Sequence, residues 1–214
     1  MSYLYDIPLE SVRGRDGVIL NVCLSKGQYQ LYTKHAIYSY GSRYANFYKL
    51  FKKMRIKESP PGEVLLLGMG LGSIPYMLER DFGVVANYTA VEYDEEVIAL
   101  ASKYVLGALN APVSVLHTDA AAYVSYSEGR YDMICVDIFV DDVIPPVFQS
   151  ISFLKSVQNL LAPGGILIFN RLYRDAHSKA DTRRYYSSVF KQVFPEAQKI
   201  VLDLNAMLVG TNNT

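Results

Sequence analysis

The sequence predicts an α/β fold built on a doubly wound, mostly parallel sheet. From residue 64 onward, short apolar runs alternate with helical patterns, and repeated strand–helix units favour a parallel sheet with right-handed crossovers. The first apolar run, residues 64–67, leads through Gly68, Gly70 and Gly72 into a helical pattern. At 214 residues, half of them hydrophobic, the chain is long enough to bury the core of one sizeable domain of this kind.

The N-terminal part has a different pattern. Residues 18–40 contain two or three β-rich runs, divided by a turn-forming segment at residues 25–28, which is typical of a β-hairpin. A helix with one apolar stripe, which includes Tyr44, is expected over residues 43–55, and the prolines and glycine of residues 59–62 then break the chain. We therefore predict an N-terminal β-hairpin region with a linking helix at residues 1–60, followed by a nucleotide-binding domain at residues 61–214.

The later elements follow in a regular order. Strands are expected to end at Glu92, at residues 117–118 and at Asp137, and acidic residues at the starts of the next helices suit the helix dipole. A helix is predicted from Pro145 to about residue 161, and a turn at residues 163–165 leads into a strand at 166–170. A helix over about 179–191 precedes two strands joined by a turn at 203–205.

The glycine loop indicates a nucleotide site. Glycine permits a tight turn and lets a ligand approach the backbone closely. The helix that follows directs its unpaired N–H groups toward the turn, which favours an anionic or hydrogen-bond-accepting ligand. Gly68, Gly70 and Gly72 are therefore candidate ligand-binding residues, although a purely structural turn is the alternative.

Three carboxylates also fall at predicted strand ends, where ligands bind in sheets of this type. Glu92 follows the glycine loop at the spacing of an acid that accepts hydrogen bonds from ribose, or else it interacts with the helix dipole. Asp119 could contact an adenine amino group or serve as an N-cap. Asp137 could accept a proton from an amine or hold a cationic substrate, or it is an ordinary loop carboxylate.

Composition narrows the functional class. The 21 basic and 21 acidic residues balance, with a sequence pI near 6.8, so no nucleic-acid partner is expected. No apolar run is long enough to span a membrane, and the N-terminus does not resemble a secretion signal. Cys23 and Cys135 lie in apolar runs and indicate reduced thiols in a cytoplasmic protein. The three histidines are scattered, so no metal site is expected.

Five segments together carry a resemblance to a known family. VLLLGMGLGS, AVEYDEEVIALASKYV, LHTDAAAYV, RYDMICVDIFVDD and LAPGGILIFN resemble the class I S-adenosylmethionine-dependent methyltransferase superfamily, and more narrowly its spermidine synthase branch. The resemblance implies a seven-stranded, Rossmann-like sheet and S-adenosylmethionine or its decarboxylated form as donor. The glycines would contact the amino-acid or aminopropyl part of the donor, Glu92 the ribose and Asp119 the adenine, while Asp137 would deprotonate an attacking amine. It also suggests a homodimer through the N-terminal hairpin.

The sequence departs from the family pattern at two places. Leu71 stands where the family has an aspartate that holds the aminopropyl ammonium, and Val140 replaces the second aspartate of the Asp-Ser-Ser-Asp signature. Asp141 and Asp142 are displaced from that position by one and two residues. We therefore predict methyl transfer to a small acceptor such as an amine. A divergent aminopropyltransferase and a catalytically silent nucleoside-binding relative are the alternatives, and the glycine loop alone could also belong to a dinucleotide site.

Overall fold

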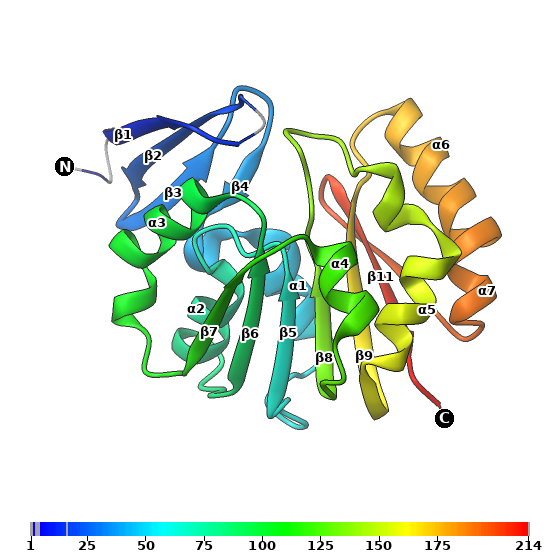
Figure 1. Cartoon of the computed structure of the whole chain (residues 1–214). Coiled ribbons are helices and arrows are strands. Elements are labelled where there is room, and N and C mark those ends of the chain that lie inside the picture. The colour runs from blue at the N-terminus through cyan, green and yellow to red at the C-terminus, as the bar shows by residue number, and fades with distance from the viewer. Residues whose placement is uncertain (1, 3–4, 16, 214) are drawn as a thin grey trace.

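The computed structural model describes residues 2, 5–15 and 17–213 and contains two sheets (Figure 1). The N-terminal sheet is antiparallel in the order β1-β2-β3-β4. Lys26 and Gly27 both adopt positive φ between β2 and β3, as the tight turn of a two-residue hairpin requires. The predicted hairpin region is confirmed, with strands β1 (Ile7–Arg13), β2 (Ile19–Ser25), β3 (Gln28–Tyr32) and β4 (Ile37–Ser39).

The main sheet has seven strands in the order β10-β11-β9-β8-β5-β6-β7. The five strands from β9 to β7 are mutually parallel, whereas β11 and β10 run antiparallel at one edge, so the predicted mostly parallel sheet is confirmed. The strand order reverses between β5 and β8, and ligands bind at such a switch. The strands are β5 (Glu63–Leu67), β6 (Asn87–Glu92), β7 (Val113–His117), β8 (Tyr131–Val136), β9 (Leu161–Leu172), β10 (Gln198–Leu202) and β11 (Asn205–Thr211).

Helices cover both faces of the main sheet (Figure 1). Leu66 of β5 belongs to the core cluster that contains α1, α2, α3 and the N-terminal sheet, whereas its neighbours Leu65 and Leu67 belong to the cluster with α4, α5 and α6. This alternation explains the continuous apolar run, because a parallel strand is buried on both faces. The helices are α1 (Ala45–Lys53), α2 (Ser73–Arg80), α3 (Glu95–Tyr104), α4 (Ala120–Tyr126), α5 (Ile151–Asn159), α6 (Ala176–Tyr185) and α7 (Lys191–Val193).

Two helices differ from the prediction. The helix expected from Pro145 to residue 161 is interrupted, because Ser150 has an extended backbone and its hydroxyl accepts a hydrogen bond from the N–H of Phe153, which caps a new helix. A short 3₁₀ helix, Pro146–Gln149, precedes this break. The last helix begins at Ala176, three residues earlier than expected, and continues through a π-helical turn into α7.

The predicted domain boundary at residue 60 stays a prediction. Phe47 and Phe51 of α1 lie in the same core cluster as Leu66 of the main sheet, so the linking helix packs onto the second part of the chain. Cys23 and Cys135 are buried and form no disulfide. None of the helices in the described part of the chain is both long and apolar enough to cross a bilayer.

Candidate active site

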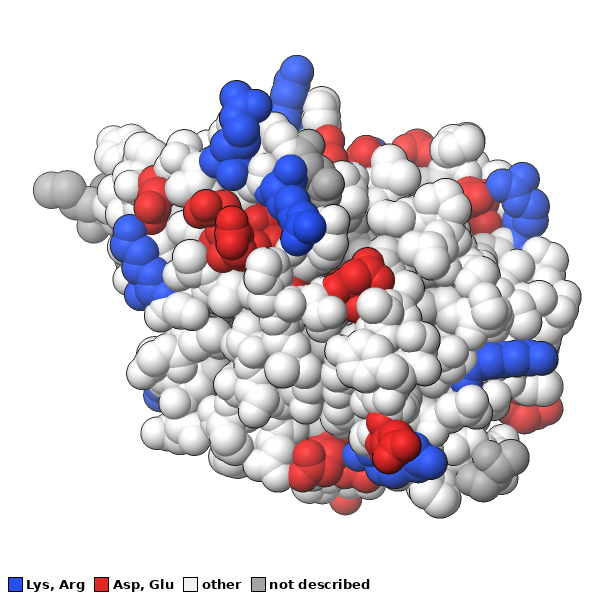
Figure 2. Space-filling model, viewed as in Figure 1, with Lys and Arg blue, Asp and Glu red and all other residues white. Residues whose placement is uncertain are grey.

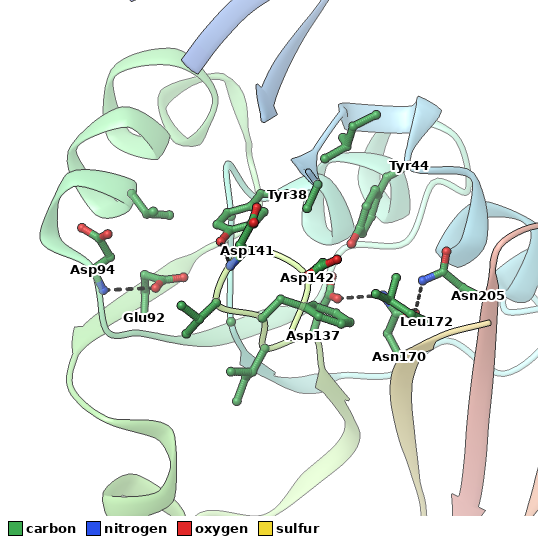
Figure 3. A pocket seen from close by; sticks show the side chains of 18 of the residues that line it. Tyr38, Tyr44, Glu92, Asp94, Asp137, Asp141, Asp142, Asn170, Leu172 and Asn205 are labelled. Carbon is green, nitrogen blue, oxygen red and sulfur yellow. Dashed lines mark hydrogen bonds between the residues drawn. The ribbon is translucent and has the colours of Figure 1, made fainter. Parts of the chain in front are cut away.

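A cavity of about 700 Å³ opens at the carboxyl ends of the central strands. Residues of β4 and the segment after it form one wall, and the β10–β11 turn forms another (Figure 3). The lining contains seven carboxylates and two guanidinium groups, so the cavity favours a cationic ligand. Figure 2 shows acidic side chains at the recess in the middle of this face. The charged lining residues are Glu92, Asp94, Asp119, Asp137, Asp141, Asp142, Asp203, Arg43 and Arg174.

The glycine loop after β5 forms part of the cavity wall. Gly68 and Gly70 line the cavity, and both have positive φ. A Cβ on Gly68 would collide with the carbonyl oxygen of Asp137, and a Cβ on Gly70 would lie 2.9 Å from that of Tyr38. Glycine is therefore required by both conformation and space. Gly72 lies outside the lining and instead precedes the first residue of α2 with a φ of 83°.

Glu92 connects the glycine loop to the end of β6. Its Oε2 accepts a hydrogen bond from the N–H of Met69 at 3.1 Å, and its Oε1 accepts bonds from the N–H groups of Tyr93 at 2.9 Å and Asp94 at 3.1 Å. Burial raises the pKa of Glu92, while these N–H groups act against the increase. A carboxylate oxygen has two lone pairs, so Oε2 keeps acceptor capacity for a ligand hydroxyl in the cavity.

Asp119 lies at the start of α4 and also lines the cavity. Its Oδ1 accepts a hydrogen bond from the N–H of Ala122 at 2.8 Å, which is the predicted N-cap contact. The cap uses one carboxylate oxygen, and the residue still faces the same cavity as Glu92. The N–H of Thr118 bonds to the carbonyl of Glu92 at 3.1 Å, which holds the two strand ends together.

Asp137 directly follows β8 and lines the cavity with the other carboxylates. Its Oδ1 accepts a hydrogen bond from Asn170 Nδ2 at 2.8 Å, and the hydroxyl of Tyr44 points toward it (Figure 3). Burial raises the pKa of Asp137 to about 6, with Glu92 adding to the increase and with Asn170 and Tyr44 acting against it. A carboxylate with a pKa near the working pH suits general base catalysis.

The comparison with protein families agrees with this geometry. Residues 50–209 match the Spermine/spermidine synthase domain. The chain belongs to the spermine/spermidine synthase family. Membership confirms the resemblance seen in the sequence and favours the transferase interpretation of the glycine loop over a dinucleotide site.

The curated relatives of this chain carry names with two different activities. A probable polyamine aminopropyl transferase of Bifidobacterium longum is 34% identical over 106 residues, which cover 50% of this chain and 23% of that relative. The eEF1A lysine and N-terminal methyltransferase of Danio rerio is 31% identical over 144 residues, which cover 63% of this chain and 21% of that protein. In both cases the match spans less than a quarter of the relative's length.

The fold is also shared with solved structures. The crystal structure of a probable spermidine synthase from Corynebacterium glutamicum matches with a TM-score of 0.73, over 95% of this chain and 80% of that one. The two sequences are 16% identical in the comparison, so this likeness concerns the fold.

The displaced aspartates of the family signature both line the cavity with Asp137. Asp141 adopts positive φ, its Oδ1 accepts a hydrogen bond from Thr33 Oγ1 at 2.5 Å, and its N–H donates to the hydroxyl of Tyr38 at 2.6 Å. Asp142 forms an ion pair with Arg174. The shift of one or two positions therefore leaves both carboxylates at the cavity, although each is already engaged.

The polar residues that were missed at the sequence level include three that lead to Asp137. Tyr44 was placed on an apolar helix stripe, but it precedes α1 and its hydroxyl faces Asp137. Asn170 lies near the end of β9, and Asn205 begins β11. The position of Asn170 at the end of a predicted strand was a signal that could have identified it. Within the described part of the chain, no group of three or more potential ligands could hold a metal ion.

Proposed function

We propose that this protein transfers a methyl group from S-adenosylmethionine to an amine. The observation that carries the proposal is that Glu92, Asp119 and Asp137 line one acidic cavity beside the glycine loop. The adenosine part would lie against Glu92 and Asp119, with the amino-acid part along Gly68 and Gly70. Both relatives act on amines by name, since one is a polyamine transferase and the other a lysine and N-terminal methyltransferase.

The chemistry needs few protein groups. The amine lone pair attacks the methyl carbon of the sulfonium, the carbon–sulfur bond breaks with its electron pair going to sulfur, and the nitrogen gives up a proton. Asp137 accepts that proton. The carboxylates of the lining attract the cationic donor, and the rigid strand ends hold donor and acceptor in line.

The glycine loop supports S-adenosylmethionine over its decarboxylated form. Leu71 is 1% exposed and lies in the core, so this position offers no carboxylate to an aminopropyl ammonium. Arg174 is paired with Asp142, whereas Arg43, which also lines the cavity, has no acidic partner among the described residues. An unpaired guanidinium complements a donor that retains its carboxylate.

Aminopropyl transfer is the second candidate. It is favoured by Asp141 and Asp142, which line the cavity with Asp137 and could accommodate a polyamine. A catalytically silent relative that binds the nucleoside, or nothing, is the third. We keep a small amine as the acceptor in this proposal, and dimerisation through the N-terminal sheet stays a prediction.

Isothermal titration calorimetry with three compounds tests the proposal. S-adenosylmethionine should bind more tightly than decarboxylated S-adenosylmethionine and methylthioadenosine. Preference for the decarboxylated donor would support aminopropyl transfer, and absence of binding to all three would leave only a silent relative.

A variant pair tests the ribose assignment. Glu92→Gln loses the charge, and its single carbonyl oxygen can accept from the N–H of Met69 or from those of Tyr93 and Asp94 but not from both sides, so donor affinity should fall at least about tenfold. Glu95→Gln, an exposed position in the first turn of α3, is the control and should bind normally. Unchanged affinity in Glu92→Gln would refute the ribose assignment.

A further inference from the structure

A row of three side chains from neighbouring strand ends leads to the Asp137 carboxylate (Figure 3). Asn205 Nδ2 donates to Asn170 Oδ1 at 2.9 Å, and Asn170 Nδ2 donates to Asp137 Oδ1 at 2.8 Å. Asn170 is 1% exposed, so its amide has little access to water as a substitute partner. All three residues line the cavity.

The orientation of the Asn170 amide decides whether its NH₂ group or its oxygen faces Asp137. An asparagine amide has a donor end and an acceptor end of nearly equal size, and rotation by half a turn exchanges them. The donor end stabilises a carboxylate, whereas the acceptor end repels it and favours the protonated acid. Asn205 donates to Asn170 Oδ1, and that bond keeps the NH₂ group directed at Asp137.

We propose that Asn205 is a positioning residue that fixes the amide of Asn170 and thereby keeps Asp137 ready to accept a proton. It touches neither donor nor acceptor in this role and acts only through Asn170. The catalytic meaning of this role rests on the proposed function, but the hydrogen-bond chain and its effect on Asp137 do not.

Other groups also face Asp137 and have to be held constant in a test. They are the Tyr44 hydroxyl, the Glu92 carboxylate and the Cys135 thiol. Asp203 lies close to Asn205 in the chain, but its carboxylate is paired with Lys49 at 2.5 Å. Neutral substitutions at Asn205 leave all these charges unchanged. Asn205→Asp would add a charge near Asp137 and is therefore not used as the test variant.

Asn205→Leu is a variant of similar shape that lacks the donor. We expect the pKa of Asp137, followed by the carboxyl ¹³C shift in NMR, to rise by about one unit. The acid limb of kcat/KM should move by the same amount. Asn205→Gln retains a donor, so the pKa of Asp137 should rise less in this variant than in Asn205→Leu. Because the NMR titration needs neither donor nor acceptor, it remains informative if no transferase activity is found.

Asn170→Leu provides the second variant and removes the bond to Asp137 directly. It should raise the pKa of Asp137 at least as much as Asn205→Leu, and the double variant should add nothing further, because the two residues act in series. The proposal is overturned if the pKa of Asp137 is unchanged in Asn205→Leu, whether or not the melting temperature falls. Additive shifts in the double variant would also overturn it.

Discussion

Replacement of Asp137 by asparagine should make the protein more stable and less active. Burial raises the pKa of this carboxyl from 3.8 to about 6, and the neutral asparagine avoids the cost of a buried charge. Its Oδ1 can still accept the hydrogen bond from Asn170. Two pKa units correspond to about 3 kcal/mol, so the gain in the free energy of unfolding at pH 8 should approach that size.

The pH dependence has a definite sign. Between about pH 4 and 6 the native state holds the Asp137 proton more tightly than the unfolded chain does, so wild-type stability falls as the pH rises through this window. Below this pH window the Asp137 carboxyl is protonated in both the native and the unfolded state. The stability gap between Asp137→Asn and wild type should therefore open from pH 4 to 6 and stay constant above.

Urea unfolding followed by circular dichroism measures this gap, since the chain contains no tryptophan. Asp6→Asn, at an exposed position, is the matched control and should show no comparable change. In parallel, kcat/KM for transfer should fall at least about 100-fold, with donor affinity preserved. A gap of equal size at pH 4 and pH 8 would refute the reasoning about the buried charge.

Two further substitutions test the glycine loop. Gly68→Ala should lower the free energy of unfolding by more than about 3 kcal/mol, because the new methyl group meets the Asp137 carbonyl. Gly83→Ala has a similar positive φ but open space, so it should cost only about 1–2 kcal/mol, and equal urea midpoints for the two variants would contradict the steric argument. Leu71→Asp should not create an aminopropyltransferase; it should instead cost about 3–5 kcal/mol through an unpaired buried charge, with Leu71→Met as the mild control. A Leu71→Asp protein with an unchanged melting temperature would show that this position is not confined to the core.

The fold and part of the site were predictable from short-range patterns. The parallel strands bring their carboxyl ends to one edge, so Glu92, Asp119 and Asp137 could be placed together from their positions after apolar runs. Their individual roles stay predictions. Gly72 could not be separated from the other glycines in this way, because local sequence does not show that it lies next to Leu106 and outside the cavity.

The remaining site residues depend on long-range register. Asn205 reaches Asn170 only because β11 inserts antiparallel between β9 and β10, with Met207 opposite Asn170. Tyr44 has the spacing of an apolar helix stripe, and its polar role depends on α1 beginning at Ala45, two residues later than predicted. Asp141 reaches Thr33 across more than a hundred residues. Local sequence patterns contain no information on any of these pairings.

The N-terminal sheet should be retained in any truncated form of this protein. The family match begins at residue 50, and a chain shortened to that limit would lose Thr33 and Tyr38, which contact Asp141, and Tyr44, which points toward Asp137. It would also uncover core residues such as Met77, which pack in one cluster with the removed strands. An inactive fragment of this kind would lack one wall of the cavity, so its inactivity would not count against the proposed methyl transfer.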